Sequence, residues 1–98
     1  MELNYEINNA AAVIGVSGRL DTVTAPELEQ YIGARLGGVE TLTLDCAGLE
    51  YISSAGLRVL LRTQKKMNAC GTMKLINVSP TIMEIFEITG FSEILTIE

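Results

Sequence analysis

The chain has 98 residues, of which 48% are hydrophobic and 19% are charged, and its formal net charge is −5. This composition is typical of a compact globular protein and excludes a disordered chain, while the acidic balance disfavours nucleic-acid binding. No apolar run approaches the roughly 20 residues that cross a bilayer, and the N-terminus lacks the basic-then-apolar order of a signal peptide. We therefore expect one domain over residues 1–98, cytoplasmic, with no direct membrane binding.

The first part of the chain predicts a β-hairpin. Residues 3–7 alternate apolar and polar side chains, as a half-buried strand does. Asn8 and Asn9 favour a turn, because asparagine tolerates positive φ. Residues 12–16 are more continuously apolar, which indicates a second strand deeper in the sheet and paired with the first.

A loop and a first helix follow. Residues 18–21 read as a loop, and Thr24 with Glu27 fits a capping box, in which a hydroxyl caps the helix and a carboxylate follows three residues later. Gly37-Gly38 is expected to end this helix, and residues 39–45 predict the third strand. The apolar side chains of the helix share one face at helical spacing: Ala25, Leu28, Ile32 and Leu36.

The alternation of strands and helices continues to the end of the chain. We expect a helix over about 54–68, a strand over 73–78, a helix that Ser79-Pro80 begins and Gly90 ends, and a last strand over 94–97. The order β-β-α-β-α-β-α-β indicates an α/β fold with a mixed, mostly parallel sheet of about five strands and an antiparallel N-terminal edge hairpin. Six apolar residues of the last two helices are expected in the core: Leu57, Leu60, Leu61, Ile82, Ile85 and Phe86.

The basic residues are unevenly spread along the chain. Five of the seven lie between Arg58 and Lys74, and residues 51–83 contain no Asp or Glu. The basic helix face is either a solvated face that suits the helix dipole or a contact for an acidic partner. Cys46 and Cys70 are too few for a disulfide framework or a metal site, and we expect both to be buried free thiols.

Several kinds of chemistry are excluded by missing residues. The chain has no histidine, which removes the Ser-His-Asp and Cys-His routes to nucleophilic catalysis. Neither G-x-x-x-x-G-K-[ST] nor G-x-G-x-x-G occurs. Asp21, Asp45 and Glu50 could cluster near the serines and bind magnesium, but the sequence does not fix that geometry. We expect no cofactor and no metal, and a binding or switch module instead of an enzyme.

Two adjacent hydroxyls, Ser53 and Ser54, lie where a strand gives way to a helix N-terminus. Such termini attract anions, and ligand sites gather at the carboxyl ends of strands in open α/β sheets. A serine here could be a helix cap, a nucleophile or a phosphate acceptor. The small residues Ala55 and Gly56 are expected to keep the helix start open to a kinase.

Three segments form a pattern in chain order that spans nearly the whole chain. They are Gly18-Arg19-Leu20-Asp21 with Thr24-Ala25, then Leu44-Asp45 with Tyr51 to Leu57, then Val78-Ser79-Pro80 with Phe86 and Thr89-Gly90-Phe91. This pattern resembles the STAS domain, and within it the bacterial anti-sigma factor antagonists, or anti-anti-sigma factors. Family members usually continue into a further C-terminal helix, whereas this sequence stops after its last expected strand.

The resemblance implies a partner switch controlled by phosphorylation. The unmodified protein would bind an anti-sigma factor that is also a serine kinase, phosphorylation on Ser54 would release it, and a PP2C-type phosphatase would reset the switch. Ser54 aligns with the phosphorylated serine, and Ser53 is the less favoured candidate. For Asp21, a purely structural role in binding turn amides is the alternative. Partner contacts are expected at Asp21, Thr24, Ser53, Ser54, Gly56 and Arg58.

Other functions stay open at this point. The first alternative is a STAS adaptor subunit of a membrane transport or lipid-trafficking ATPase, which needs no phosphorylation cycle. A nucleotide-binding module is the next, because the loop resembles an anion site, and an independent enzyme is the least favoured.

Overall fold

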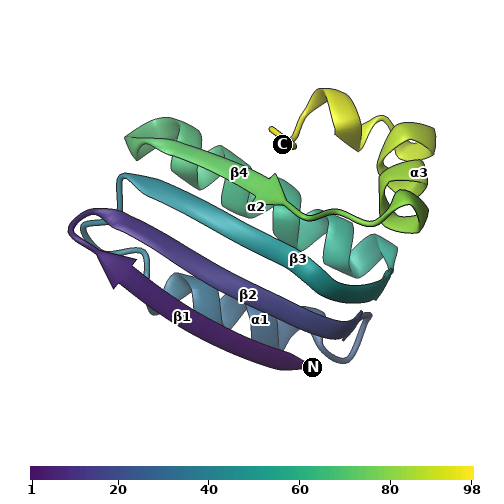
Figure 1. Cartoon of the computed structure of the whole chain (residues 1–98), viewed down its shortest axis with the longest axis horizontal. Helices are drawn as coiled ribbons and strands as arrows, with labels where there is room; N and C mark the ends of the chain where they lie inside the picture. Colours follow the sequence, from purple (N-terminus) through teal and green to yellow (C-terminus); the bar gives the residue numbers. More distant parts are fainter.

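The computed structural model describes residues 1–98 as one mixed sheet with three helices (Figure 1). The sheet has the strand order β1-β2-β3-β4, in which β1 is antiparallel to β2 and the other neighbours are parallel. The predicted α/β class, the edge hairpin and the mostly parallel sheet are therefore confirmed. The elements are β1 (Glu2–Asn8), β2 (Ala11–Leu20), α1 (Ala25–Gly33), β3 (Thr41–Ile52), α2 (Ser54–Cys70), β4 (Thr72–Ile76), α3 (Pro80–Thr89) and the 3-10 turn η1 (Phe91–Glu93).

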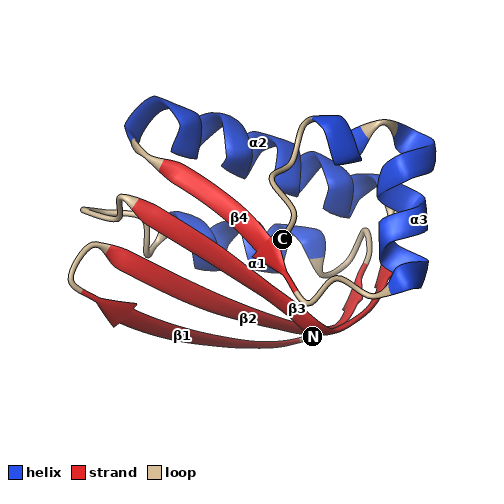
Figure 2. Cartoon of the chain, turned by 45° about the horizontal axis from the view of Figure 1, so that its top comes forward, coloured by secondary structure: helices blue, strands red, loops and turns tan.

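The helices leave one face of the sheet uncovered. Helices α1 and α2 lie against the same face, and α3 lies beyond the carboxyl ends of the parallel strands, while no helix covers the opposite face (Figure 2). Side chains of a strand alternate between faces, so one face of the first halves of β2 and β3 is buried under the helices: Ala12, Ile14, Val16, Leu42 and Leu44. No helix is long and apolar enough to span a membrane.

The core lies between the sheet and the two covering helices. Leu57, Leu60, Ile82 and Phe86 are buried as predicted, whereas Leu61 and Ile85 are only half-buried. Each of those two residues neighbours a fully buried one and is rotated from it by about 100° around the helix, which places it on the flank. Burial of a side chain such as Leu60 stabilises the fold by roughly 1.5–3 kcal/mol.

Strands β2 and β3 run further than the hydrophobic pattern predicts. The segment 18–20, expected as a loop, is the end of β2, and β3 continues from residue 45 to residue 52. The ladder between them shifts register between Gly15 and Ser17 and again between Gly18 and Arg19. These irregularities break the two-residue alternation, because each one resets which side chains face the core.

The expected last strand is reduced to a single bridge, so the sheet has four strands instead of about five. Leu75 of β4 bridges to Ile97, with hydrogen bonds from Leu75 N to Thr96 O and from Glu98 N to Leu75 O. The turn η1 occupies the chain just before this segment. Only the last few residues therefore lie beside β4.

The helix termini confirm two predicted caps and correct a third. Ser79 Oγ accepts a hydrogen bond from Ile82 N, and Gly90 ends α3 in the left-handed region with φ of 82°. The capping box at Thr24 is wrong, because Thr24 has helical dihedrals and its hydroxyl points back to the preceding loop. Helix α1 ends at Gly33, before the predicted Gly-Gly stop.

The two cysteines differ in environment. Cys46 on β3 is buried, and that burial raises the pKa of its thiol to about 12. Cys70 is exposed, which corrects the prediction that both thiols are buried. Cys70 lies two residues beyond the predicted end of α2 at Asn68, in a run of exposed residues over 68–70.

Candidate functional site

The candidate site lies where the parallel strands β2 and β3 end side by side. Leu20 pairs with Ile52 across the ladder, and Ser53 N donates a hydrogen bond of 2.9 Å to Leu20 O. The loop after β2 and the start of α2 therefore meet at the carboxyl ends of these two central strands, although they are about thirty residues apart in the chain (Figure 1).

The two serines have different roles in the structure. Ser53 is the N-cap of α2, with extended backbone dihedrals, and its Oγ accepts a hydrogen bond of 3.4 Å from Gly56 N. Ser54 is the first residue of the helix; its side chain is exposed and its hydroxyl makes no hydrogen bond within the protein. The capping function thus falls on one hydroxyl and leaves the other open to solvent.

The start of α2 is electropositive. The helix has 17 residues and no acidic side chain in its first turn, and the exposed Arg58 begins its second turn. The N–H groups of Ser54 and Ala55 have no acceptor within the helix, since the first N–H groups of any helix lack one. Together with the helix dipole, which is equivalent to roughly +0.5 charge at this end, they favour an anionic group.

Gly56 packs inward, against the ends of the two strands. A Cβ atom on this residue would lie 2.6 Å from Leu20 Cγ and 2.9 Å from Ile52 Cγ1. The missing side chain lets α2 approach the sheet closely, which gives Gly56 a packing role in place of the expected role in opening the site to a kinase. Ala55 is half-buried beside it.

Asp21 and Thr24 tie the β2–α1 loop together. Asp21 Oδ1 accepts hydrogen bonds of 3.0 Å from the N–H groups of Val23 and Thr24, and Asp21 N donates to Thr24 Oγ1 at 2.9 Å. The N–H of Thr24 is the main cause that lowers the pKa of the Asp21 carboxyl. Asp21 therefore does bind the turn amides, as its purely structural role would require. Its contact with a partner stays a prediction.

Sequence reasoning missed a cation–aromatic pair that flanks this loop. The Arg19 guanidinium carbon lies 4.1 Å from the centroid of the Tyr51 ring, and Arg19 Nε lies 3.8 Å from Asp21 Oδ2. The pair forms because Arg19 and Tyr51 are partners in the ladder, a register that only the extended β3 reveals. Next to it, Val23 exposes 84% of its surface.

The carboxylate cluster that the sequence left open does not form. Asp45 lies on the helix-free face of the sheet, where its Oδ1 accepts hydrogen bonds from Ala47 N and from Asn77 Nδ2, each at 3.1 Å. Because β3 continues for seven more residues, Asp45 is carried roughly 20 Å from the serines. No three acidic or cysteine side chains, Asp21 and Glu50 included, come together in a group that could hold a metal ion.

Comparison with known proteins places this geometry in a family. A family model described as the STAS domain matches residues 2–98. The chain belongs to the STAS domain family. The family predicted from the three sequence segments is thus confirmed, and the match extends over the sheet, the helices and the candidate site.

Named relatives of this STAS domain point to one function. BtrV of Bordetella bronchiseptica, whose name places it among anti-sigma factor antagonists, is 33% identical over 96 residues, which cover 96% of this chain and 83% of the relative. The crystal structure of an anti-sigma factor antagonist from Mycobacterium paratuberculosis superposes with a TM-score of 0.88 at 29% identity, covering 98% of this chain and 83% of that one.

A second protein of known structure shares the fold at lower identity. The anti-sigma factor antagonist SpoIIAA in its unphosphorylated form has a TM-score of 0.77 at 23% identity and covers 99% of this chain and 87% of its own. In its phosphorylated form, SpoIIAA from Bacillus has a TM-score of 0.76 at the same identity, covering 99% of this chain and 91% of its own. Both forms of SpoIIAA thus have the architecture seen in this chain.

Proposed function

We propose that this STAS domain is an anti-sigma factor antagonist whose binding is switched by phosphorylation of Ser54. The unmodified protein binds an anti-sigma factor that is also a serine kinase, phosphorylation releases that partner, and a PP2C-type phosphatase restores binding. The protein acts in the cytoplasm and has no catalytic activity of its own. The antagonist names of BtrV and of the M. paratuberculosis protein support the general function.

One observation carries the choice of Ser54. Its hydroxyl is exposed and unbonded at the first position of α2, while the neighbouring Ser53 performs the capping. A kinase can therefore modify Ser54 without removing a structural hydrogen bond. Modification of Ser53 would break the cap, which is worth about 1 kcal/mol.

The physical chemistry of the site fits a switch that changes binding and leaves the fold intact. A phosphate adds roughly −1.5 to −2 charge at neutral pH. The free N–H groups and the dipole of α2 stabilise that charge, and the cationic Arg58 follows at the start of the second turn. The main effect of the phosphate therefore falls on a docked partner, through its bulk and through repulsion of acidic groups.

The residues expected to contact the partner have different parts in this proposal. Asp21 and Thr24 hold the β2–α1 loop in one conformation, so that it docks without a large ordering cost. Ser53, Ser54 and Arg58 present the modified end of the helix. Gly56 acts indirectly, because it is buried and sets how closely α2 approaches the sheet.

The test is a pull-down from the native lysate with wild type, Ser54→Ala and Ser54→Asp as baits, followed by identification of the captured proteins. We expect wild type and Ser54→Ala to capture a serine-kinase anti-sigma factor and Ser54→Asp to lose it. Thr81→Asp is a matched control, because Thr81 is an exposed hydroxyl in the first turn of α3. That variant should bind like wild type.

Two outcomes would contradict the proposal. If the purified kinase modifies Ser54→Ala as fast as wild type, the assigned residue is wrong. If all baits capture the same transporter component equally, binding does not depend on phosphorylation, and the adaptor function replaces the proposed one.

A further inference from the structure

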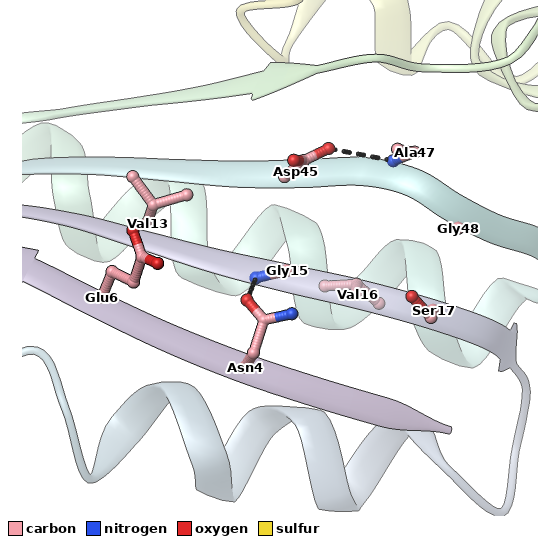
Figure 3. A pocket seen from close by; sticks show the side chains of 9 residues that line it. All are labelled: Asn4, Glu6, Val13, Gly15, Val16, Ser17, Asp45, Ala47 and Gly48. Atoms are coloured by element: carbon pink, nitrogen blue, oxygen red, sulfur yellow. Dashed lines mark hydrogen bonds between the residues drawn. The ribbon is translucent and has the colours of Figure 1, made fainter.

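The helix-free face of the sheet contains a hollow that the proposed function does not use. It has a volume of about 320 Å³ and opens to solvent between β1, β2 and β3 (Figure 3). Two glycines form its floor. A Cβ on Gly15 would lie 2.6 Å from the Asn4 side-chain amide, and a Cβ on Gly48 would lie 2.3 Å from Ser17 Oγ. The Asn4 and Ser17 side chains occupy the space that a Cβ on these glycines would need, so both positions require glycine.

The register of the strands arranges acidic side chains around this hollow. Gly15 pairs with Asn4 on one side and with Asp45 on the other, and the next pair on the same face of β1 and β2 is Glu6 with Val13. Glu6 and Asp45 therefore lie two strand spacings apart across the sheet and two residues apart along it, which separates their backbones by roughly 12 Å. That separation is too wide for a shared metal ion, but it suits the head group of a long cationic side chain.

Several polar groups of the hollow have no partner within the protein. Asp45 Oδ1 accepts both hydrogen bonds of its carboxylate, which leaves Oδ2 without one. Asn4 uses only its Oδ1, which accepts from Gly15 N at 3.2 Å. The Glu6 carboxylate and the Ser17 hydroxyl make no hydrogen bond or ion pair. The hollow therefore offers mainly acceptors to a ligand that carries several donors.

The acidic side chains on this face of the sheet outnumber the basic ones that could pair with them. Glu2, Glu6 and Asp45 have no cationic partner, whereas Lys74 on β4 is neutralised by Glu98, with 3.5 Å between Nζ and Oε1. The residues that line the hollow include no lysine or arginine. The unpaired charge on this face is therefore negative, and its complement is a basic group.

We propose that this face is a second docking surface, which receives a lysine or arginine side chain from a basic, extended partner segment in the hollow. The methylene stem lies on Val13, and the charged head lies between the carboxylates of Glu6 and Asp45. The segment runs along β1, whose outer edge is unpaired because β1 ends the sheet. This proposal does not depend on phosphorylation of Ser54.

The same charges argue against a second copy of this chain as the occupant. Pairing two β1 strands edge to edge would bring Glu2 and Glu6 of both copies into one ladder, and like charges across strands repel. A basic segment instead forms opposite-charge pairs with the same two residues.

The experiment is an NMR titration of the whole chain, labelled with ¹⁵N, with a short peptide in which lysine and threonine alternate. The amide shifts should change around Asn4, Gly15, Ser17 and Gly48. Glu6→Gln should weaken binding about two- to fivefold, as expected for one exposed ion pair. The control is Glu87→Gln on α3, which removes the same charge from an exposed position away from the sheet and should leave the affinity unchanged.

The proposal is overturned if Glu87→Gln weakens binding as much as Glu6→Gln, because the peptide then responds only to net charge. It is also overturned if a peptide that alternates glutamate and threonine gives the same shifts, or if the lysine peptide shifts only the start of α2. Ser54→Asp should bind the lysine peptide like wild type. Since no kinase enters the experiment, its result is independent of the proposed switch.

Discussion

The starts of helices α1 and α2 lie side by side at the carboxyl ends of β2 and β3, yet their hydroxyls are used in opposite ways. At α1, Thr24 Oγ1 lies 2.7 Å from Arg19 O and accepts a hydrogen bond from Asp21 N, so the hydroxyl is fully engaged in the loop. At α2, Ser53 takes over the capping and Ser54 is left unbonded. A rigid loop beside a free hydroxyl is what a modifiable docking site requires, since modification then disturbs no internal contact.

The largest effect on stability is expected from adding a side chain at Gly56, where α2 packs closely against the sheet. Gly56→Ala should destabilise the protein by about 1–3 kcal/mol, because the added Cβ overlaps Leu20 and Ile52. Urea unfolding measures the change. Gly33→Ala is the matched control, since this helical glycine of α1 has no atom within 4 Å of a new Cβ, and it should be neutral or stabilising. Equal effects of the two substitutions would show that α2 is not seated by close packing.

Removal of the engaged hydroxyl at the start of α1 should have the next largest effect. Thr24→Val keeps the shape of the side chain but leaves Asp21 N and Arg19 O without their partner, which should cost about 1–2 kcal/mol. The loss should appear in urea unfolding and as faster hydrogen exchange of the Asp21 amide. An unchanged exchange rate at Asp21 would mean that Thr24 does not hold the loop.

A smaller, pH-dependent effect is expected from Asp21. Hydrogen bonds to its carboxylate hold its pKa in the folded protein below that of the unfolded chain, which is about 3.9. Its contribution to stability is therefore fully present above that value and is lost as the pH falls through the folded pKa. Asp21→Ala should be less stable than wild type at neutral pH, and the difference should shrink in strong acid. A gap that persists unchanged would assign the effect to something other than ionisation.

The extent to which these features were predictable depends on how local their signals are. The hairpin, the Ser79-Pro80 start of α3 and the position of the paired serines follow from residues close together in the chain. The end of β3 does not, because each register shift beside Gly15 and Gly18 of β2 places an extra residue in β3 and hides the alternation of its side chains. The Arg19–Tyr51 pair depends on that register and could not be predicted without it.

Thr24 shows the limit of a local motif at the site itself. The residues Thr24 and Glu27 match a capping box, but ψ of −19° at Thr24 turns the hydroxyl away from the helix. The Thr24 hydroxyl instead forms hydrogen bonds with Asp21, three residues earlier. Which partner the hydroxyl takes depends on the conformation in which the loop leaves β2. By contrast, Ser53 has ψ of 175°, the extended geometry that a cap requires, and its hydroxyl does bond the helix.

The smallest effect should come from the hydroxyl that the proposal makes central. Ser54→Ala removes no hydrogen bond and places a better helix former at an exposed position, so the free energy of unfolding should stay within about 0.5 kcal/mol of wild type. Ser53→Ala is the contrast, with an expected loss of about 1 kcal/mol from the missing cap. If Ser54→Ala were the more destabilising of the two, the free hydroxyl would be a structural one, and the separation of capping from modification would fail.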